Sequence, residues 1–224
     1  MEKTHDIIGL GNMLMDFLIE VDYEVLGKFN LQKGGMHLVD EEQAQKVLSH
    51  IKELNLDVDL VPGGSVANSI RALGLHNAKV TLCGKVGKDI QGQTYIEEIK
   101  NHGVNSAITT HSKITGHAIT FITPDSERTF MVHLGAALEL YKEDIIENDI
   151  AKSKILYIEG YQLEGPTKET VLNTLEIAKK HGTKIAIDLS DSGLIKRSRE
   201  ILTSVVHNYA DILFMNEQEA AEFT

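Results

Sequence analysis

The sequence predicts an α/β protein built on a mainly parallel β-sheet, and two observations support this fold class. Five short runs rich in Ile, Val and Leu lack a polar alternate face, as expected for strands that are buried on both sides. Longer amphipathic stretches lie between these runs, and several are followed by a glycine that can end a helix, as at Gly103 and Gly182. Alternation of this kind is typical of βαβ units, in which helices cover a parallel sheet.

The predicted core elements follow one another along the chain. The apolar runs predict strands at 6–11, 79–83, 154–159, 184–189 and 211–215. The amphipathic stretches predict helices at 41–55, 65–75, 91–101, 167–180 and 194–207. In the fourth of these helices Val171, Leu172, Leu175 and Ala178 share one face, which indicates the side that packs on the sheet.

Two segments interrupt this alternation. Residues 17–22 and 36–39 have the character of strands, separated by a glycine-containing connection. Residues 117–123 and 128–133 are alternating strands on either side of the turn sequence Pro124-Asp125-Ser126-Glu127. These hairpin-like segments predict either a small separate sheet that forms a lid over the active-site edge or a decoration of the main sheet's edge. The pattern favours neither.

Composition excludes several classes of protein. The 224 residues include 22 basic and 33 acidic side chains, a net charge of −11 that repels phosphate backbones and anionic lipid. No apolar run approaches the roughly 20 residues of a membrane helix, and the N-terminal residues are not those of a signal peptide. Cys83 is the only cysteine, which excludes an internal disulfide and a CxxC metal site. We therefore expect a cytoplasmic protein with no nucleic-acid or membrane partner.

A glycine pair before the second core helix is the first candidate site. Gly63 and Gly64 allow backbone N–H groups to approach an oxygen-rich ligand, and the following helix N-terminus favours partial negative charge there. The alternative is a tight turn in which Ser65 is the N-cap. Asn68 lies one turn into the helix on the same side, and this placement favours a ligand site.

The segment after the first strand carries the second candidate. Gly9-Leu10-Gly11 begins a dinucleotide fingerprint, but the third glycine would have to stand at Leu14, so an oxidoreductase is disfavoured. A phosphate-binding P-loop also fails, because Gly87-Lys88 is followed by Asp89. Asp16 lies at the start of the strand that leaves the sheet edge. Its carboxylate is suited to accept hydrogen bonds from adjacent sugar hydroxyls, and the alternative is an ordinary exposed aspartate.

The last strand leads into a third candidate, Asn216 followed three residues later by Glu219. This spacing matches a helix capping box. The same two side chains at the carboxyl end of a parallel strand are also suited to hold a hydrated Mg²⁺ and its phosphates, and both interpretations can be true together. His111 and His117, six residues apart, favour surface positions over a metal pair.

In their order along the chain, these motifs resemble the ribokinase-like (PfkB) carbohydrate kinases, most closely the adenosine-kinase-like branch. The matching segments are 9–16, 33–40, 63–74, 84–92, 127–137, 158–161, 188–191 and 211–219. The resemblance implies a three-layer α/β sandwich with a mainly parallel central sheet and a small β lid. On this pattern residues 1–16, 41–106 and 134–224 form the core, and residues 17–40 and 107–133 form the lid.

The resemblance also implies an activity, the transfer of the ATP γ-phosphoryl group to a hydroxymethyl group of a sugar or nucleoside. An adenosine-like nucleoside is the first expectation for the substrate, and ribose or fructose is the next. ATP and Mg²⁺ are the implied cofactors. The residues implied in substrate binding are Asn12, Asp16, Gly63, Gly64 and Asn68; those implied in phosphate binding are Arg128 and Asn216; and those implied in holding the metal through water are Glu219 and Asn216.

One departure from the family pattern affects the predicted activity. The family's second signature, G-x-G-D, carries the catalytic Asp base and is absent from these 224 residues. The resemblance therefore places the catalytic base after Thr224, and we assign no catalytic residue within the chain. We expect the chain to be truncated before that signature and to be inactive alone. A non-catalytic sugar- or nucleoside-binding protein is the alternative. Homodimerisation through the lid is a further expectation from the resemblance.

Overall fold

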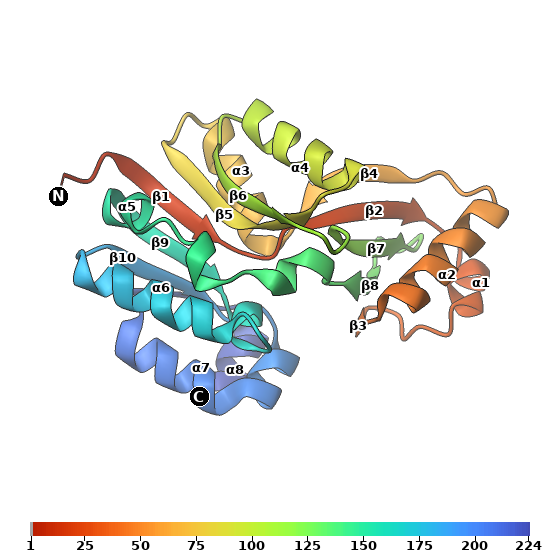
Figure 1. Cartoon of the computed structure of the whole chain (residues 1–224). Coiled ribbons are helices and arrows are strands. Elements are labelled where there is room, and N and C mark those ends of the chain that lie inside the picture. The colour runs from red at the N-terminus through yellow and green to blue at the C-terminus, as the bar shows by residue number, and fades with distance from the viewer. Residues whose placement is uncertain (1) are drawn as a thin grey trace.

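The computed structural model describes residues 2–224, which form two β-sheets with flanking helices (Figure 1). The larger sheet has six strands, all parallel, in the order β11-β10-β9-β1-β5-β6. Its strands are β1 (His5–Leu10), β5 (Val80–Gly87), β6 (Asn105–His111), β9 (Ser153–Glu159), β10 (Lys184–Asp188) and β11 (Ile212–Phe214). The predicted α/β class and the mainly parallel central sheet are confirmed.

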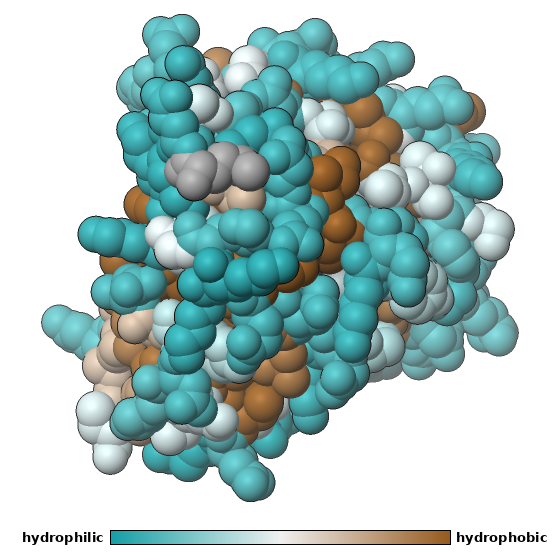
Figure 2. Space-filling model, turned by 60° about the vertical axis from the view of Figure 1, so that its left-hand side comes forward, coloured by the Kyte–Doolittle hydropathy of each residue, from teal (hydrophilic) through white to brown (hydrophobic). Residues whose placement is uncertain are grey.

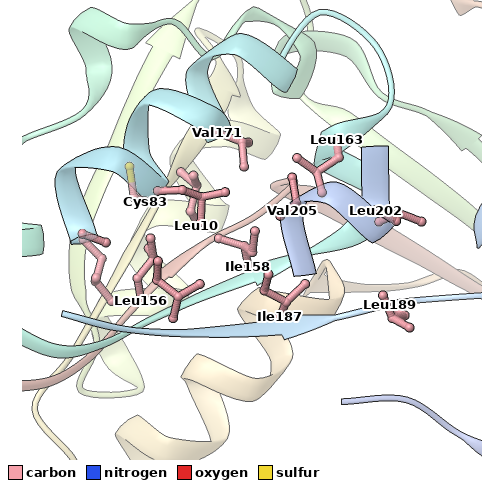
Figure 3. Packing of buried hydrophobic residues seen from close by; sticks show 14 of the residues in the cluster. Leu10, Cys83, Leu156, Ile158, Leu163, Val171, Ile187, Leu189, Leu202 and Val205 are labelled. Carbon is pink, nitrogen blue, oxygen red and sulfur yellow. The ribbon is translucent and has the colours of Figure 1, made fainter. Parts of the chain in front are cut away.

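Helices cover both faces of this sheet because neighbouring residues of each strand point to opposite sides. On one face Ile7 and Leu82 pack with residues of α3 and α4, and on the other Ile8 and Leu156 pack with residues of α6 and α7. Figure 3 shows part of the second cluster, in which Ile158 and Ile187 of the sheet approach Val205 of α7. The helices are α3 (Ser65–Leu75), α4 (Ile90–Asn101), α5 (Glu147–Ala151), α6 (Lys168–Lys180), α7 (Ser192–Tyr209) and α8 (Glu217–Phe223).

The second sheet is separate from the parallel sheet, and we call it the lid. It has five strands in the order β3-β8-β7-β2-β4. They are β2 (Leu14–Glu20), β3 (Met36–Leu38), β4 (Asp59–Gly63), β7 (Gly116–Ile122) and β8 (Arg128–His133). Helices α1 (Tyr23–Lys28) and α2 (Glu41–Glu53) complete it, since Leu26 and Ile51 share a hydrophobic cluster with Ile19 and Phe121 of the lid strands.

The lid differs from the sequence prediction at several places. Strands β7 and β8 form the predicted antiparallel hairpin, but β2 and β3 do not pair with each other. Helix α1 separates them, and β2 pairs with β7 while β3 pairs with β8, in both cases parallel. The predicted lid ranges 17–40 and 107–133 also omit β4 and α2 and include most of β6, which belongs to the parallel sheet.

The chain passes between the two sheets four times, after β1, β4, β6 and β8. These connections bring the lid next to the carboxyl ends of the parallel strands (Figure 1). Across residues 2–224, every helix is too short or too polar to pass through a lipid bilayer. The face of the molecule seen in Figure 2 is mostly hydrophilic, with hydrophobic side chains gathered in a few groups among polar ones.

Candidate functional site

The candidate site lies where β1 and β9 end beside the lid. Asn12 follows β1, Glu159 is the last residue of β9, and Gly64 joins β4 of the lid to α3. The carboxyl ends of parallel strands are the usual position of ligand sites in α/β sheets. Sequence segments that are far apart therefore converge at one edge of the sheet.

The start of α3 is held by a side chain from another strand. Gly64 is the N-cap residue, with φ of 98° and no side chain to cap the helix. A Cβ atom at this position would collide with the Asn12 carbonyl oxygen, so both the backbone angle and the space require glycine. Ser65 is thus the first residue inside the helix, and the alternative in which Ser65 is the N-cap is excluded. Its hydroxyl instead donates a hydrogen bond to Glu159.

Asp16 lies on β2, packed against the backbone of Gly63. A Cβ atom on Gly63 would overlap the Asp16 carboxylate, so the glycine leaves room for the acidic side chain. Burial raises the pKa of Asp16 to about 6, although Arg71 and Arg128 act in the opposite direction. Cross-strand register places Arg128 on the same face of the lid sheet as Asp16. The predicted sugar-binding aspartate is therefore a largely buried carboxylate near two arginines.

Two residues that were not predicted from the sequence hold the glycine turn. The Tyr95 hydroxyl donates to the Gly63 carbonyl oxygen at 2.7 Å. The Arg71 guanidinium donates to the Pro62 carbonyl oxygen at 2.6 Å and to Asn68 Oδ1 at 3.1 Å. The Asn68 side chain is thereby oriented by an arginine one helical turn further along α3.

A cavity of about 340 Å³ lies between the start of α3, the lid and the segment after β9. Its volume is within the range of roughly 300–1,000 Å³ that is common for small-molecule sites. Asn12, Ser65 and Glu159 form a polar end. Half of the remaining lining is apolar and comes from the lid and the segment that follows it: Leu14, Met36, Leu38, Val132, Leu134 and Leu138.

Asn216 and Glu219 form the predicted capping box at the start of α8. Asn216 Oδ1 accepts from the Glu219 amide at 2.9 Å, and the Glu219 carboxylate accepts from the Asn216 amide at 3.0 Å and from Asn216 Nδ2 at 2.7 Å. Each Glu219 carboxylate oxygen accepts one of these hydrogen bonds, and the residue is 5% exposed, so its side chain is held in the capping box and is largely shielded from solvent. The described residues also contain no group of three or more His, Cys, Asp or Glu suited to a metal ion.

Thr224 follows α8 and is exposed. Its amide and its hydroxyl both donate to the Ala220 carbonyl oxygen, at 3.1 and 2.9 Å, so it closes the last turn of the helix. The catalytic base that the resemblance places after Thr224 lies outside the described residues, and its position stays a prediction. No residue from 2 to 224 is assigned as that base.

The structure brings most of the predicted substrate residues together. Asn12 and Gly64 line the cavity, and Gly63 contacts Asp16 next to them. Asn216 and Glu219 follow β11, which lies three strands from β1 on the same edge. Glu159 was not predicted from the sequence. Its signal was an acidic residue directly after the apolar run 155–158 of β9, where a buried carboxylate needs a specific purpose.

Comparison with known proteins supports a single family. The sequence profile of the "pfkB family carbohydrate kinase" matches residues 39–224. Guanosine-inosine kinase of Escherichia coli (strain K12) is 24% identical, and the match covers 97% of this chain and 52% of that protein. Adenosine kinase of Saccharomyces cerevisiae is 28% identical, and the match covers 98% of this chain and 66% of that protein. The crystal structure of adenosine kinase from Sinorhizobium meliloti superimposes with a TM-score of 0.89 at 28% identity, covering 98% of this chain and 67% of that one.

These matches extend over nearly the whole chain, although the chain spans only about half to two thirds of the relatives' length. The profile match covers most of both sheets and of the candidate site. The chain therefore belongs to the pfkB family of carbohydrate kinases.

Proposed function

We propose that this chain is the acceptor-binding part of an ATP- and Mg²⁺-dependent kinase that phosphorylates a hydroxymethyl group of a nucleoside. An adenosine-like nucleoside is the preferred acceptor, with a free sugar such as ribose or fructose next. The observation that carries this preference is the cavity, which has a polar end formed by Asn12, Ser65 and Glu159 and an apolar wall supplied by the lid. Relatives named as adenosine kinase and guanosine-inosine kinase support the same choice.

The two ends of the cavity suit the two halves of a nucleoside. Asn12 and Ser65 lie at the polar end, and Asp16 shares a face of β2 with Leu14, which lines the cavity. A carboxylate there accepts hydrogen bonds from two ribose hydroxyls. At the other end Met36 and Leu38 are 41% and 57% exposed, and an aromatic base covering them would bury apolar surface that a free sugar would leave in water.

The remaining predicted residues would act at a distance from the cavity. Arg128 lies on the Asp16 face of the lid and would reduce the negative charge of the phosphates. Asn216 would contact phosphate at the end of β11, and Mg²⁺ would be held through water by Glu219 and Asn216, whose side chains form the capping box. Binding without turnover is expected of these 224 residues, because they contain no G-x-G-D sequence.

Calorimetric titration of the chain with adenosine and with ribose tests the proposal. We expect adenosine to bind at least tenfold more tightly than ribose. Leu38→Asp should weaken adenosine binding at least tenfold and leave ribose binding nearly unchanged, because only the base contacts this residue. Leu60→Asp is the matched control, since Leu60 is also on an edge strand of the lid and is 53% exposed, yet lies outside the cavity lining.

Binding of neither compound would contradict the proposed acceptor class. Equal effects of the two leucine substitutions would contradict the base position. Phosphorylation of adenosine by the chain would contradict the expected lack of turnover. A separate prediction, a homodimer formed through the lid, is checked by sedimentation analysis.

A further inference from the structure

Glu159 connects three segments of the candidate site. It is 2% exposed, and its Oε1 accepts a hydrogen bond from the Asn12 amide at 3.1 Å. Its Oε2 accepts from the Ser65 hydroxyl, and the Val66 amide also donates to the carboxylate. Glu159 therefore caps α3 in place of Gly64, which has no side chain. The positive end of the α3 dipole is thus already occupied by a carboxylate of the protein itself.

Glu159 differs from the other acidic side chains near the cavity in having neutral partners. Glu164 is paired with Arg197, whose Nε and Nη2 lie 3.0 and 3.1 Å from the Glu164 oxygens. Asp16 lies near Arg71 and Arg128. The groups with the largest effects on Glu159 are three neutral donors and a second acid, Asp188.

The charge of the cavity follows from these pairings. Burial raises the pKa of Glu159, whereas its hydrogen-bond donors favour the ionised form. Among the described residues that line the cavity there are two glutamates and no lysine, arginine or histidine. Because Arg197 neutralises Glu164, the uncompensated negative charge of the lining belongs to Glu159 at pH values above its raised pKa. A buried carboxylate without a cation is costly, and such groups are concentrated at functional sites.

We propose that Glu159 determines acceptor specificity by making the cavity accept uncharged compounds and reject phosphorylated ones. A phosphate group in the cavity would meet the Glu159 carboxylate at close range, and it would find the N-terminus of α3 already capped. An uncharged nucleoside does not experience this repulsion. The inference rests on the proposed function, because it concerns the choice of acceptor at the same site.

The test measures binding of adenosine and of its 2′-, 3′- and 5′-monophosphates to the chain by calorimetry at mildly alkaline pH. We expect the wild-type protein to bind adenosine at least tenfold more tightly than each monophosphate. Glu159→Gln keeps the size of the side chain and one acceptor oxygen but removes the charge. This substitution should reduce the largest of the three preference ratios at least fivefold, mainly by tightening binding of the monophosphate.

A second variant separates the position of the charge from the simple loss of a negative charge. Glu147→Gln removes one negative charge at a surface position where Glu147 pairs with Lys180 and His181, and it should leave the ratios unchanged. A fivefold loss of preference in Glu147→Gln would overturn the proposal.

The inference and the proposed function fail in different ways. Wild-type protein that binds a monophosphate as tightly as adenosine would overturn the inference while leaving the proposed acceptor class intact, and this comparison needs no folded variant. Unchanged ratios in folded Glu159→Gln would also overturn it. Should adenosine itself not bind, the proposed acceptor class fails, and ribose against ribose 5-phosphate then tests the rejection of phosphorylated compounds with the same thresholds.

Discussion

Asp16→Asn is expected to stabilise the fold and weaken ligand binding in the same protein. Burial raises the pKa of Asp16 from 3.8 to about 6, so the folded state holds the proton more tightly than the unfolded state. The cost of ionising Asp16 therefore appears as pH rises from about 4 to about 6 and stays constant above that. Asparagine has nearly the same shape and no charge, so this cost is absent from the variant.

The magnitude follows from the pKa difference. A pKa raised by about two units lowers the free energy of unfolding by about 3 kcal/mol at pH about 7.5. The same relation gives a loss of about 1 kcal/mol at pH about 4.5. The larger figure is an upper bound, because water still reaches part of the side chain. Loss of a charge-assisted hydrogen bond to a ribose hydroxyl is worth about 1.5–3 kcal/mol, which corresponds to roughly ten- to 150-fold weaker adenosine binding.

Urea denaturation at the two pH values and calorimetric titration with adenosine measure both effects. We expect Asp16→Asn to exceed wild type in unfolding free energy at the higher pH, with a smaller difference at the lower pH. Asp59→Asn removes the same charge from an exposed position of the lid sheet and is the control. A variant that is less stable than wild type at the higher pH, or a difference that does not change with pH, would refute the reasoning about burial.

Three further substitutions test other parts of the structure. Gly64→Ala should lower the unfolding free energy by more than about 1 kcal/mol, because φ of 98° and the Asn12 carbonyl oxygen both disfavour a Cβ atom; an unchanged denaturation midpoint would contradict this. Lys85→Met should lower the free energy of unfolding by about 3–5 kcal/mol, because it leaves Asp144 without the buried partner whose Nζ lies 2.6 Å away. The double variant Lys85→Met/Asp144→Leu should recover most of that loss in the same denaturation assay. The expected surface position of His117 is wrong, since the residue is 5% exposed. Burial lowers the pKa of His117 below 6.5, so wild-type stability should fall as pH drops through that value. His117→Phe should flatten the pH dependence of thermal unfolding, and an equally steep curve would argue against His117 as the titrating group.

The fold was predictable where burial leaves a simple pattern. Strands β1, β9 and β10 are buried on both sides, so their apolar runs identify them within one residue of the observed bounds. Strand β6 was missed because its sequence, Asn105–His111, is largely polar at one edge of the sheet. Strand β4 was missed because Pro62 and Gly63 resemble a turn, whereas edge strands tolerate both residues.

The candidate site was predictable only in part, for a different reason. Asn12, Asp16 and Gly64 belong to local motifs, so they could be chosen from the sequence. Glu159 acts through a hydrogen bond to a residue 147 positions away, and no local pattern contains that contact. The capping box of Asn216 and Glu219 was correctly predicted because it lies within one helical turn.

The four crossings between the sheets have a consequence for protein engineering. The lid is assembled from chain segments that alternate with segments of the parallel sheet, and β2 pairs with β7 about a hundred residues further along. Exchange of one continuous chain segment cannot transfer this lid to another scaffold. A chimera would have to exchange several separate stretches at once, and each junction would fall next to a residue of the candidate site or its supporting turns. The proposed acceptor specificity is therefore easier to alter by point substitutions at the cavity than by grafting a lid from a relative.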